Sequence, residues 1–224
     1  MKNYIKKSMS WLTTILVPIW LLLTAIRILI TPVYPMIEYR MPRFPEDTFG
    51  FTREDRLFWA KPTIEYLINT EDICFLAELK FDDGTAIYDE RELSHMVDVK
   101  VLVQLMIKVW LGVSAILLVS GIVMYFAGWR EDLRTGYKRG GWASVGLVVM
   151  MLLFVLISFN QLFNWFHLLF FKDDTWLFYY SDTLIRLFPL RFWQDAFIFV
   201  GLFCLLVGLL LVFLLMKKRT IGQH

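Results

Sequence analysis

Four long apolar runs constrain what this chain can fold into more than any other feature of its sequence. They cover residues 8–30, 101–129, 142–166 and 196–216. A helix needs roughly 20 apolar residues to cross about 30 Å of hydrocarbon, and each run is long enough. Because lipid cannot satisfy free backbone groups, such runs are expected to be helical. The composition agrees, since 58% of the 224 residues are hydrophobic and 20% are charged, which excludes a disordered chain, a coiled coil and an ordinary soluble enzyme.

Charge is distributed unevenly between the segments that flank these runs. The N-terminal tail, the loop at 130–141 and the C-terminal tail together hold ten basic and two acidic residues, whereas residues 32–98 hold seven basic and fifteen acidic ones. Lysine and arginine favour the cytoplasmic side of a membrane, so both termini are expected there and residues 32–98 outside. The formal net charge of +2 gives no indication of a nucleic-acid partner.

These patterns predict an all-α integral membrane protein with four transmembrane helices, a small α+β extracellular cap and an interfacial aromatic segment. The first run is too long for a signal peptide and is expected to remain as an anchor. The predicted division is a cytoplasmic tail with the first span at 1–31, the cap at 32–98, the second span at 99–129, a cytoplasmic loop at 130–141, the third span at 142–167, an extracellular interfacial segment at 168–194, the fourth span at 195–216 and a cytoplasmic tail at 217–224.

The predicted cap contains three local folding signals. Residues 52–55 (TRED) indicate a capping box that opens a helix. Residues 73–81 alternate in polarity, residues 82–84 (DDG) form a turn signal, and residues 85–88 resume an extended pattern, which together predict a β-hairpin. Residues 89–92 then place acids in the first turn of a helix that is expected to continue into the second run.

Aromatic residues are concentrated between the last two runs. Residues 170–193 contain nine of them, and Ser181 and Asp182 indicate the start of a short helix before Pro189. A segment of this kind suits the membrane interface. The aromatic side chains either form only a belt at headgroup depth or also wall an apolar binding pocket, and both interpretations stay open.

Two histidines are the candidate acid–base pair. His95 lies just before the second run and His167 just after the third, so the predicted topology brings them to the same depth. Glu92 and Asp98 share a helical side with His95, and either carboxylate is a candidate to orient its ring. Asn164 lies one turn before His167 and contributes to a polar stripe. The alternative for each histidine is an ordinary residue of the interface.

The sequence predicts no metal and no cofactor. Glu92 and His95 form a single E-x-x-H pair, but a metal site would need a second such pair or further ligands. A bis-histidine haem would need facing ligands inside the bundle, whereas these two histidines lie at its rim. The chain also lacks a P-loop, a dinucleotide fingerprint and a G-x-S-x-G motif. An enzyme built on these histidines therefore acts on a substrate that brings its own nucleophile.

Several stretches resemble the lipoprotein intramolecular transacylase (Lit) family of low-GC Gram-positive bacteria. They are residues 49–56 (FGFTREDR), 92–100 (ELSHMVDVK) and 159–167 (FNQLFNWFH), the last leading into Trp176 and residues 184–189 (LIRLFP). The four-helix layout with an outer cap also fits, and the resemblance covers essentially the whole chain.

The resemblance implies a function in the bacterial plasma membrane. Members of the family move the sn-2 acyl chain of a diacylglyceryl lipoprotein to the α-amino group of its N-terminal cysteine, which gives a lyso-form lipoprotein. It also implies that His95 and His167 are the catalytic pair, and that the partners are the diacylated lipoprotein and membrane lipid. Such a reaction needs a donor to the oxyanion, for which a protonated histidine, Asn164, Trp176 and Arg186 are the candidates.

Three other functions compete with this one. The first is a non-enzymatic membrane assembly or partner-binding protein that uses an acidic extracellular cap. The second is an intermolecular lipid acyltransferase or hydrolase that uses the same histidine pair. The third is a small transporter, against which the uncharged third run counts. The sequence makes no prediction of the oligomeric state.

Overall fold

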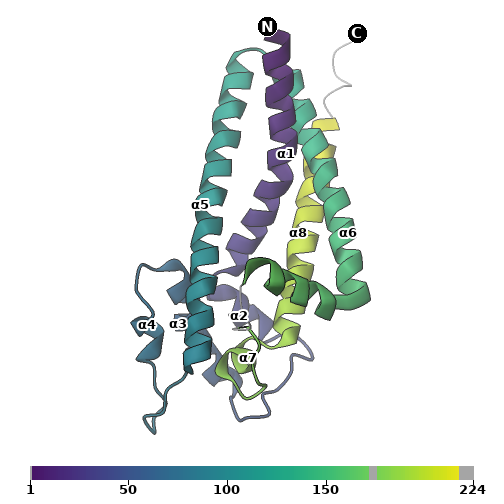
Figure 1. The fold of residues 1–224 in the computed structure, drawn as a ribbon. Coiled ribbons are helices and arrows are strands. Elements are labelled where there is room, and N and C mark those ends of the chain that lie inside the picture. The colour runs from purple at the N-terminus through teal and green to yellow at the C-terminus, as the bar shows by residue number, and fades with distance from the viewer. Residues whose placement is uncertain (1, 172–175, 217–224) are drawn as a thin grey trace. The chain divides into compact units, whose positions relative to one another are not determined.

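The computed structural model describes residues 2–171 and 176–216, which form eight helices (Figure 1). They are α1 (Lys2–Leu29), α2 (Val33–Glu38), α3 (Arg53–Ile68), α4 (Cys74–Ala77), α5 (Glu90–Phe126), α6 (Arg130–Phe170), α7 (Thr183–Leu187) and α8 (Leu190–Met216). The predicted tail at 217–224 and residues 172–175 of the predicted interfacial segment lie outside the described residues.

The chain divides into two compact units. We call the first the bundle unit, which comprises Met1–Ile26, Ile107–Leu156 and Ile198–His224. We call the second the cap unit, which comprises Arg27–Met106 and Ile157–Phe197. Both candidate histidines belong to the cap unit.

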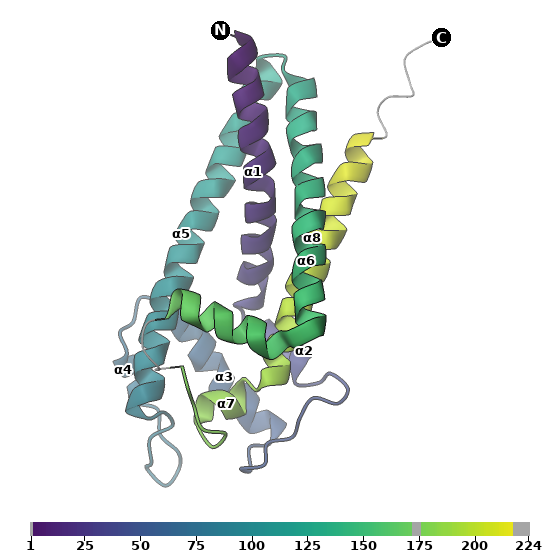
Figure 2. The same cartoon turned by 45° about the vertical axis from the view of Figure 1, so that its right-hand side comes forward.

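Four helices, α1, α5, α6 and α8, are long and apolar enough to cross a membrane. Within the bundle unit they run side by side (Figures 1 and 2). Only 17–28% of each apolar window is buried inside the chain, so most of the apolar side chains point outward. A water-soluble protein rarely exposes so much apolar surface, whereas lipid covers it without cost. The predicted all-helical layout with four candidate membrane spans is confirmed.

Close helix contacts in the bundle unit depend on glycine. A Cβ atom at Gly141 of α6 would lie 2.8 Å from the carbonyl oxygen of Gly208 in α8, and one at Gly136 would lie 2.7 Å from the carbonyl oxygen of Ser10 in α1. Small residues at such positions allow helix backbones to approach closely where no hydrophobic force drives association.

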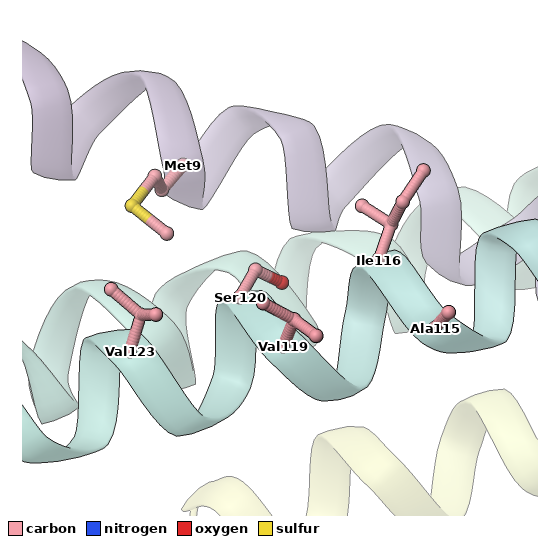
Figure 3. Close-up of a pocket in the computed structure, with 6 residues that line it drawn as sticks. All are labelled: Met9, Ala115, Ile116, Val119, Ser120 and Val123. Carbon is pink, nitrogen blue, oxygen red and sulfur yellow. The ribbon is translucent and has the colours of Figure 1, made fainter.

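A shallow apolar groove of about 350 Å³ lies between α1 and α5 (Figure 3). It is lined by Met9, Ala115, Ile116, Val119, Ser120 and Val123. The hydroxyl of Ser120 donates to the carbonyl oxygen of Leu117 at 3.2 Å, which leaves no free donor in the groove. This surface suits a lipid chain and offers no polar group to orient a substrate.

The cap unit has its own core. It forms around buried side chains of α3, α4, α5 and α7 and of the loop before α5, namely Tyr66, Leu76, Ile87, Tyr88, Met96, Leu184 and Leu187. The predicted capping box is confirmed at the start of α3, where Thr52 and Asp55 exchange side-chain and backbone hydrogen bonds of 2.8 and 3.1 Å. The core holds α7 against the first turns of α5.

The predicted α+β character of the cap is wrong. No strand occurs among residues 2–171 and 176–216, and the expected hairpin is reduced to one isolated bridge between Lys80 and Ala86. The predicted turn does form, with Gly84 at φ 85°. The first predicted strand is interrupted because Asp72 accepts the backbone N–H of Cys74 at 2.8 Å, which starts the short helix α4 and buries Leu76 completely.

Two features of the long helices position the candidate site. Helix α5 begins at Glu90 and continues without interruption into the second apolar run, as predicted. Helix α6 contains a kink at Ser158, where the backbone leaves helical geometry, so its last segment up to Phe170 forms a separate helical piece (Figure 2). This last segment carries His167 into the cap unit.

Candidate active site

The structure brings the two predicted histidines together. His95 lies near the start of α5 and His167 near the end of α6, which are 72 positions apart in the chain. Their ring centroids are 6.3 Å apart and the ring planes differ by 21°. Both residues are only 8% exposed. Burial of both imidazoles keeps them largely away from bulk water.

Aromatic side chains enclose this pair. The ring of His95 packs against Phe171 at 5.0 Å and edge-on against Phe178 at 5.3 Å. The ring of His167 packs against Phe163 at 4.2 Å and Trp176 at 4.8 Å. We call Phe163, Phe171, Trp176 and Phe178 the aromatic box. It surrounds the histidines with apolar surface and few competing hydrogen-bond partners.

The aromatic segment therefore divides into two groups. Phe171, Trp176 and Phe178 turn toward the histidines. Tyr179 and Tyr180 turn away from them and are 68% and 85% exposed. The choice between a belt at headgroup depth and an apolar pocket stays a prediction for this segment.

One hydrogen bond indicates the tautomer of His167. Its Nδ1 lies 2.8 Å from the carbonyl oxygen of Phe163, one helical turn earlier. A carbonyl oxygen only accepts, so Nδ1 carries the hydrogen. In the neutral ring the lone pair is then on Nε2, which is the nitrogen that remains for a substrate.

Two buried polar atoms in the box have no partner. Nδ1 of His95 and Nε1 of Trp176 are both buried, and neither makes a hydrogen bond to any part of the chain that the structure describes. Buried polar atoms are nearly always satisfied, so two orphans in one aromatic enclosure need a reason. A bound substrate provides such a reason if it offers an acceptor to the indole N–H of Trp176 and a donor or an acceptor to Nδ1 of His95.

The carboxylates flanking His95 do not orient its ring. Glu92 is 2% exposed, and its two oxygens accept the backbone N–H groups of Asp89 at 2.9 Å and Leu184 at 2.7 Å. Asp98 is exposed, and no contact between it and His95 is found within residues 2–171 and 176–216. The ring of His95 is instead held by packing against Phe171 and Phe178.

Further contacts fasten the segment before α7 onto the start of α5. Arg91 forms a 2.7 Å ion pair with Asp182, and its guanidinium lies over the ring of Tyr179 at 4.9 Å. The hydroxyl of Thr183 donates to the carbonyl oxygen of Ile87 at 2.6 Å. Sequence reasoning missed these residues because ordinary charged and hydroxyl residues, far apart in the chain, carry no local signal of their pairing.

Arg186 and Asn164 are not brought to the histidines. The guanidinium of Arg186 binds the carboxylate of Asp47 at 3.0 and 3.1 Å and lies over the ring of Phe51 at 3.5 Å. Burial alone would raise the pKa of the Asp47 carboxyl, but hydrogen bonds from Arg186 and from the amide of Phe51 outweigh it and hold that pKa below its usual value. Asn164 is exposed on α6.

Within the described ranges, no group of three or more His, Cys, Asp or Glu side chains is arranged to hold a metal ion.

Comparisons with known proteins extend over nearly the whole chain. A family model described as lipoprotein intramolecular transacylase Lit matches residues 11–193, a range that contains both histidines. An uncharacterized protein of Aquifex aeolicus is 28% identical over 227 residues, which cover 97% of this chain and 99% of that protein.

Solved structures of the membrane integral lipoprotein intramolecular transacylase Lit from Bacillus cereus share the fold. One superimposes with a TM-score of 0.78 at 19% identity, covering 98% of this chain and 100% of that one. A second, of a variant in which a histidine is replaced by arginine, has a TM-score of 0.71 at 18% identity and covers 99% of this chain and 96% of that one.

Proposed function

Because the chain belongs to the lipoprotein intramolecular transacylase (Lit) family and is therefore a membrane acyltransferase, we propose the reaction that it performs and the residues that perform it. The substrate is a diacylglyceryl lipoprotein with a free α-amino group on its N-terminal cysteine. The sn-2 acyl chain moves from the glyceryl oxygen to this amine, which leaves an N-acylated, S-monoacylated lipoprotein. The observation that carries the proposal is the pair of buried histidines inside the aromatic box.

His167 is the base. An α-amine has a pKa of about 7.7–8.0 and is mostly protonated at neutral pH, so it needs a group that takes its proton before it attacks. Since Nδ1 of His167 donates to the carbonyl oxygen of Phe163, its Nε2 has the free lone pair. The deprotonated amine nitrogen then forms a bond to the ester carbonyl carbon.

His95 is the partner that completes proton transfer. When the tetrahedral intermediate collapses, the bond between the carbonyl carbon and the glyceryl oxygen breaks, and that oxygen requires a proton. His167 takes the first proton of the ammonium group and releases it to the solvent. After the attack the nitrogen still carries one proton too many; Nε2 of His167 takes this second proton and His95 relays it to the glyceryl oxygen, so that both rings end neutral. One amide is formed, one ester is broken, one proton passes from the nitrogen to the glyceryl oxygen and one is released to the solvent. No water is consumed, and no covalent intermediate forms between the enzyme and the acyl chain.

Trp176 is the donor to the oxyanion. Its ring lies 4.8 Å from that of His167, and its Nε1–H is buried without an acceptor. A donor that is already in place stabilises the charge as it develops and needs no rearrangement. Asn164 is exposed and Arg186 is occupied by Asp47, so they support the site only indirectly. Glu92 supports it by anchoring Leu184.

The aromatic box favours transfer over hydrolysis. Nucleophile and ester belong to one molecule, and well-oriented intramolecular reactions reach effective molarities of about 10⁵–10⁸ M. Positioning then supplies much of the acceleration, provided that water does not compete. Exposed apolar residues at the end of α6, such as Leu168 and Leu169, offer a route from the hydrocarbon for the acyl chain.

We propose that this multi-pass membrane protein has both termini in the cytoplasm and residues 32–98 and 168–194 outside. The excess of basic residues in the tails and in the loop at 130–141 supports this orientation. It places the histidines at the outer edge of the bilayer, where a lipoprotein presents its N-terminal cysteine. The spans at 1–31, 99–129, 142–167 and 195–216 belong to the same proposal.

The test is mass spectrometry of a reporter lipoprotein produced in a host that lacks the activity. The wild-type protein is expected to give lyso-form lipoprotein, and His95→Ala and His167→Ala are each expected to abolish it while the protein still inserts into the membrane. Gln161→Ala, exposed on the same segment of α6 as His167, is the matched control and should remain active. Normal product from both histidine variants would refute the proposed mechanism.

Isotope labelling separates this reaction from the intermolecular alternatives. Donor and acceptor lipoproteins that carry different labels are mixed in one vesicle with the purified protein. Intramolecular transfer predicts that both labels stay on their original molecules. Crossed products would indicate transfer between molecules, and free fatty acid would indicate hydrolysis.

A further inference from the structure

A second groove in the bundle unit is polar and has no role in the proposed reaction. It has a volume of about 280 Å³ and is lined by Lys7, Ser10 and Trp11 of α1 and by Asp132, Thr135 and Arg139 of α6. We propose that this groove binds the phosphate group of an anionic membrane phospholipid. Its volume is below the roughly 300–1,000 Å³ of pockets for drug-sized ligands, so it suits a headgroup rather than a whole lipid.

The charges in and beside the groove favour an anion. The carboxylate of Asp132 already has a cation, since Nζ of Lys6 lies 3.6 Å from it. Lys7 and Arg139 form no ion pair with any residue in the ranges 2–171 and 176–216, although Arg139 lies over the ring of Trp11 at 4.7 Å. Both side chains are exposed, so an anion from outside the described chain can reach these two positive charges.

The hydrogen-bond donors of the groove also fit a phosphate. The hydroxyl of Ser10 donates to the carbonyl oxygen of Asp132 and that of Thr135 to the carbonyl oxygen of Glu131, each at 2.7 Å. The donors that remain are the ammonium of Lys7, the guanidinium of Arg139 and the indole of the half-exposed Trp11. A guanidinium matches phosphate oxygens in a bidentate geometry, and an ammonium adds a point charge.

The position of the groove along the helices points to a lipid as the source of the phosphate. The apolar runs begin at residues 8 and 142, next to Lys7 and close to Arg139, so both helices leave the hydrocarbon at this level. Tryptophan at such a level lies among the headgroups, and basic pockets between membrane helices bind anionic lipids. An ammonium-bearing headgroup is disfavoured, because the carboxylate that would receive its ammonium is already paired with Lys6.

Native mass spectrometry of the purified full-length protein tests this proposal with three added lipids, phosphatidylglycerol, phosphatidylethanolamine and phosphatidylcholine. Phosphatidylglycerol is expected to bind about tenfold more tightly than the other two. The double variant Lys7→Gln/Arg139→Gln should lose this preference. The control Lys2→Gln/Lys138→Gln removes the same charge from residues that do not line the groove, and it should keep the preference.

One further variant is expected to strengthen binding of phosphatidylglycerol rather than weaken it. Asp132→Asn removes the only carboxylate of the groove and should tighten binding of phosphatidylglycerol. Equal binding of the three lipids by the wild-type protein would overturn the proposal, as would an equal loss of preference in the control pair. Thermal stabilisation by inorganic phosphate alone, equal to that by phosphatidylglycerol, would overturn the assignment to a lipid. None of these outcomes depends on the transacylase reaction.

Discussion

The carboxylate of Glu92 accepts the backbone N–H of Leu184 at 2.7 Å, although 92 positions of the chain separate the two residues. Leu184 lies in the first turn of α7, where N–H groups lack partners within the helix. Glu92 satisfies one of them and, through its other oxygen, the N–H of Asp89. His95 lies one turn further along α5, so this carboxylate ties the part of α5 that carries the histidine to the start of α7.

Replacing Glu92 is expected to destabilise the cap unit. Glu92→Ala leaves the buried N–H of Leu184 unpaired, which costs about 1–3 kcal/mol, and also frees the N–H of the exposed Asp89, which water can reach. Glu92→Gln retains one accepting oxygen and should lose roughly half as much. The measurement is thermal unfolding of the purified protein in detergent, with the exposed Glu90→Gln as the control. Equal unfolding temperatures for Glu92→Ala and the control would contradict the anchoring role.

The pair formed by Asp47 and Arg186 is expected to stabilise the protein without taking part in the reaction. Both side chains are largely buried, and removing one partner of a buried pair costs roughly 3–5 kcal/mol. Arg186→Gln should therefore lower the unfolding temperature, while the rate per folded molecule stays close to wild type. The exposed pair of Arg53 and Glu54 provides the control, because Arg53→Gln should cost about 0–1 kcal/mol.

This pair also predicts a pH dependence. The pKa of Asp47 lies below its ordinary value of 3.8, so the folded protein binds the proton less readily than the unfolded chain. Its contribution to stability is present above about pH 3.8 and is lost as the pH falls through the lower, folded pKa. The stability difference between wild type and Asp47→Asn should therefore shrink on acidification below that value. A difference independent of pH would exclude this linkage.

Glu38 predicts a pH dependence of the opposite sign. Burial, with the neighbouring Asp195 carboxyl, raises the pKa of Glu38 from 4.5 to about 7. The folded protein binds the proton more tightly, so the free energy of unfolding should fall as the pH rises from about 4.5 through about 7. Glu38→Gln cannot titrate and should remove this part of the fall. The exposed Glu46→Gln should retain it, and the same pH profile for both variants would argue against the assignment.

Trp176→Phe is expected to slow the reaction without unfolding the site. The substitution keeps an aromatic ring beside His167 and removes the unpartnered Nε1–H. Loss of one oxyanion donor typically lowers kcat by about 10²–10³-fold, whereas KM should change little. Trp165→Phe, at a 51% exposed position on α6, the helix that carries His167, is the control. A wild-type kcat for Trp176→Phe would assign the oxyanion to another donor.

Glycine substitutions test the helix contacts of the bundle unit. Gly141→Ala places a Cβ 2.8 Å from a backbone oxygen of Gly208, and overpacking of this kind costs about 1–3 kcal/mol. Gly146→Ala, on the same helix, meets nothing within 4 Å and should be neutral or slightly stabilising. Thermal unfolding of the two variants side by side is the measurement. A stable Gly141→Ala protein would show that α6 and α8 do not pack as described.

The sequence by itself determined the four membrane helices and the histidine pair as a candidate. Both depend on patterns that are local or one-dimensional. An apolar run of 20 or more residues has few alternatives to a membrane helix. The capping box at Thr52 and the uninterrupted start of α5 are likewise decided by neighbours within one turn. The sequence indicates the two histidines because His95 lies just before the second apolar run and His167 just after the third, at the same expected depth in the membrane.

Only the tertiary structure decided what surrounds the histidines. Glu92 and Asp98 were the two candidates to orient His95, but the carboxylate of Glu92 accepts the N–H of Leu184, a partner that no spacing along α5 reveals. Arg186 was a candidate donor to the oxyanion, but Asp47 occupies it from 139 positions away. The predicted hairpin lost to a short helix because burial of Leu76 in the cap core outweighs a weak alternating pattern. For Glu92 and Arg186 the competing partner comes from a distant part of the chain, and only packing brings it within reach.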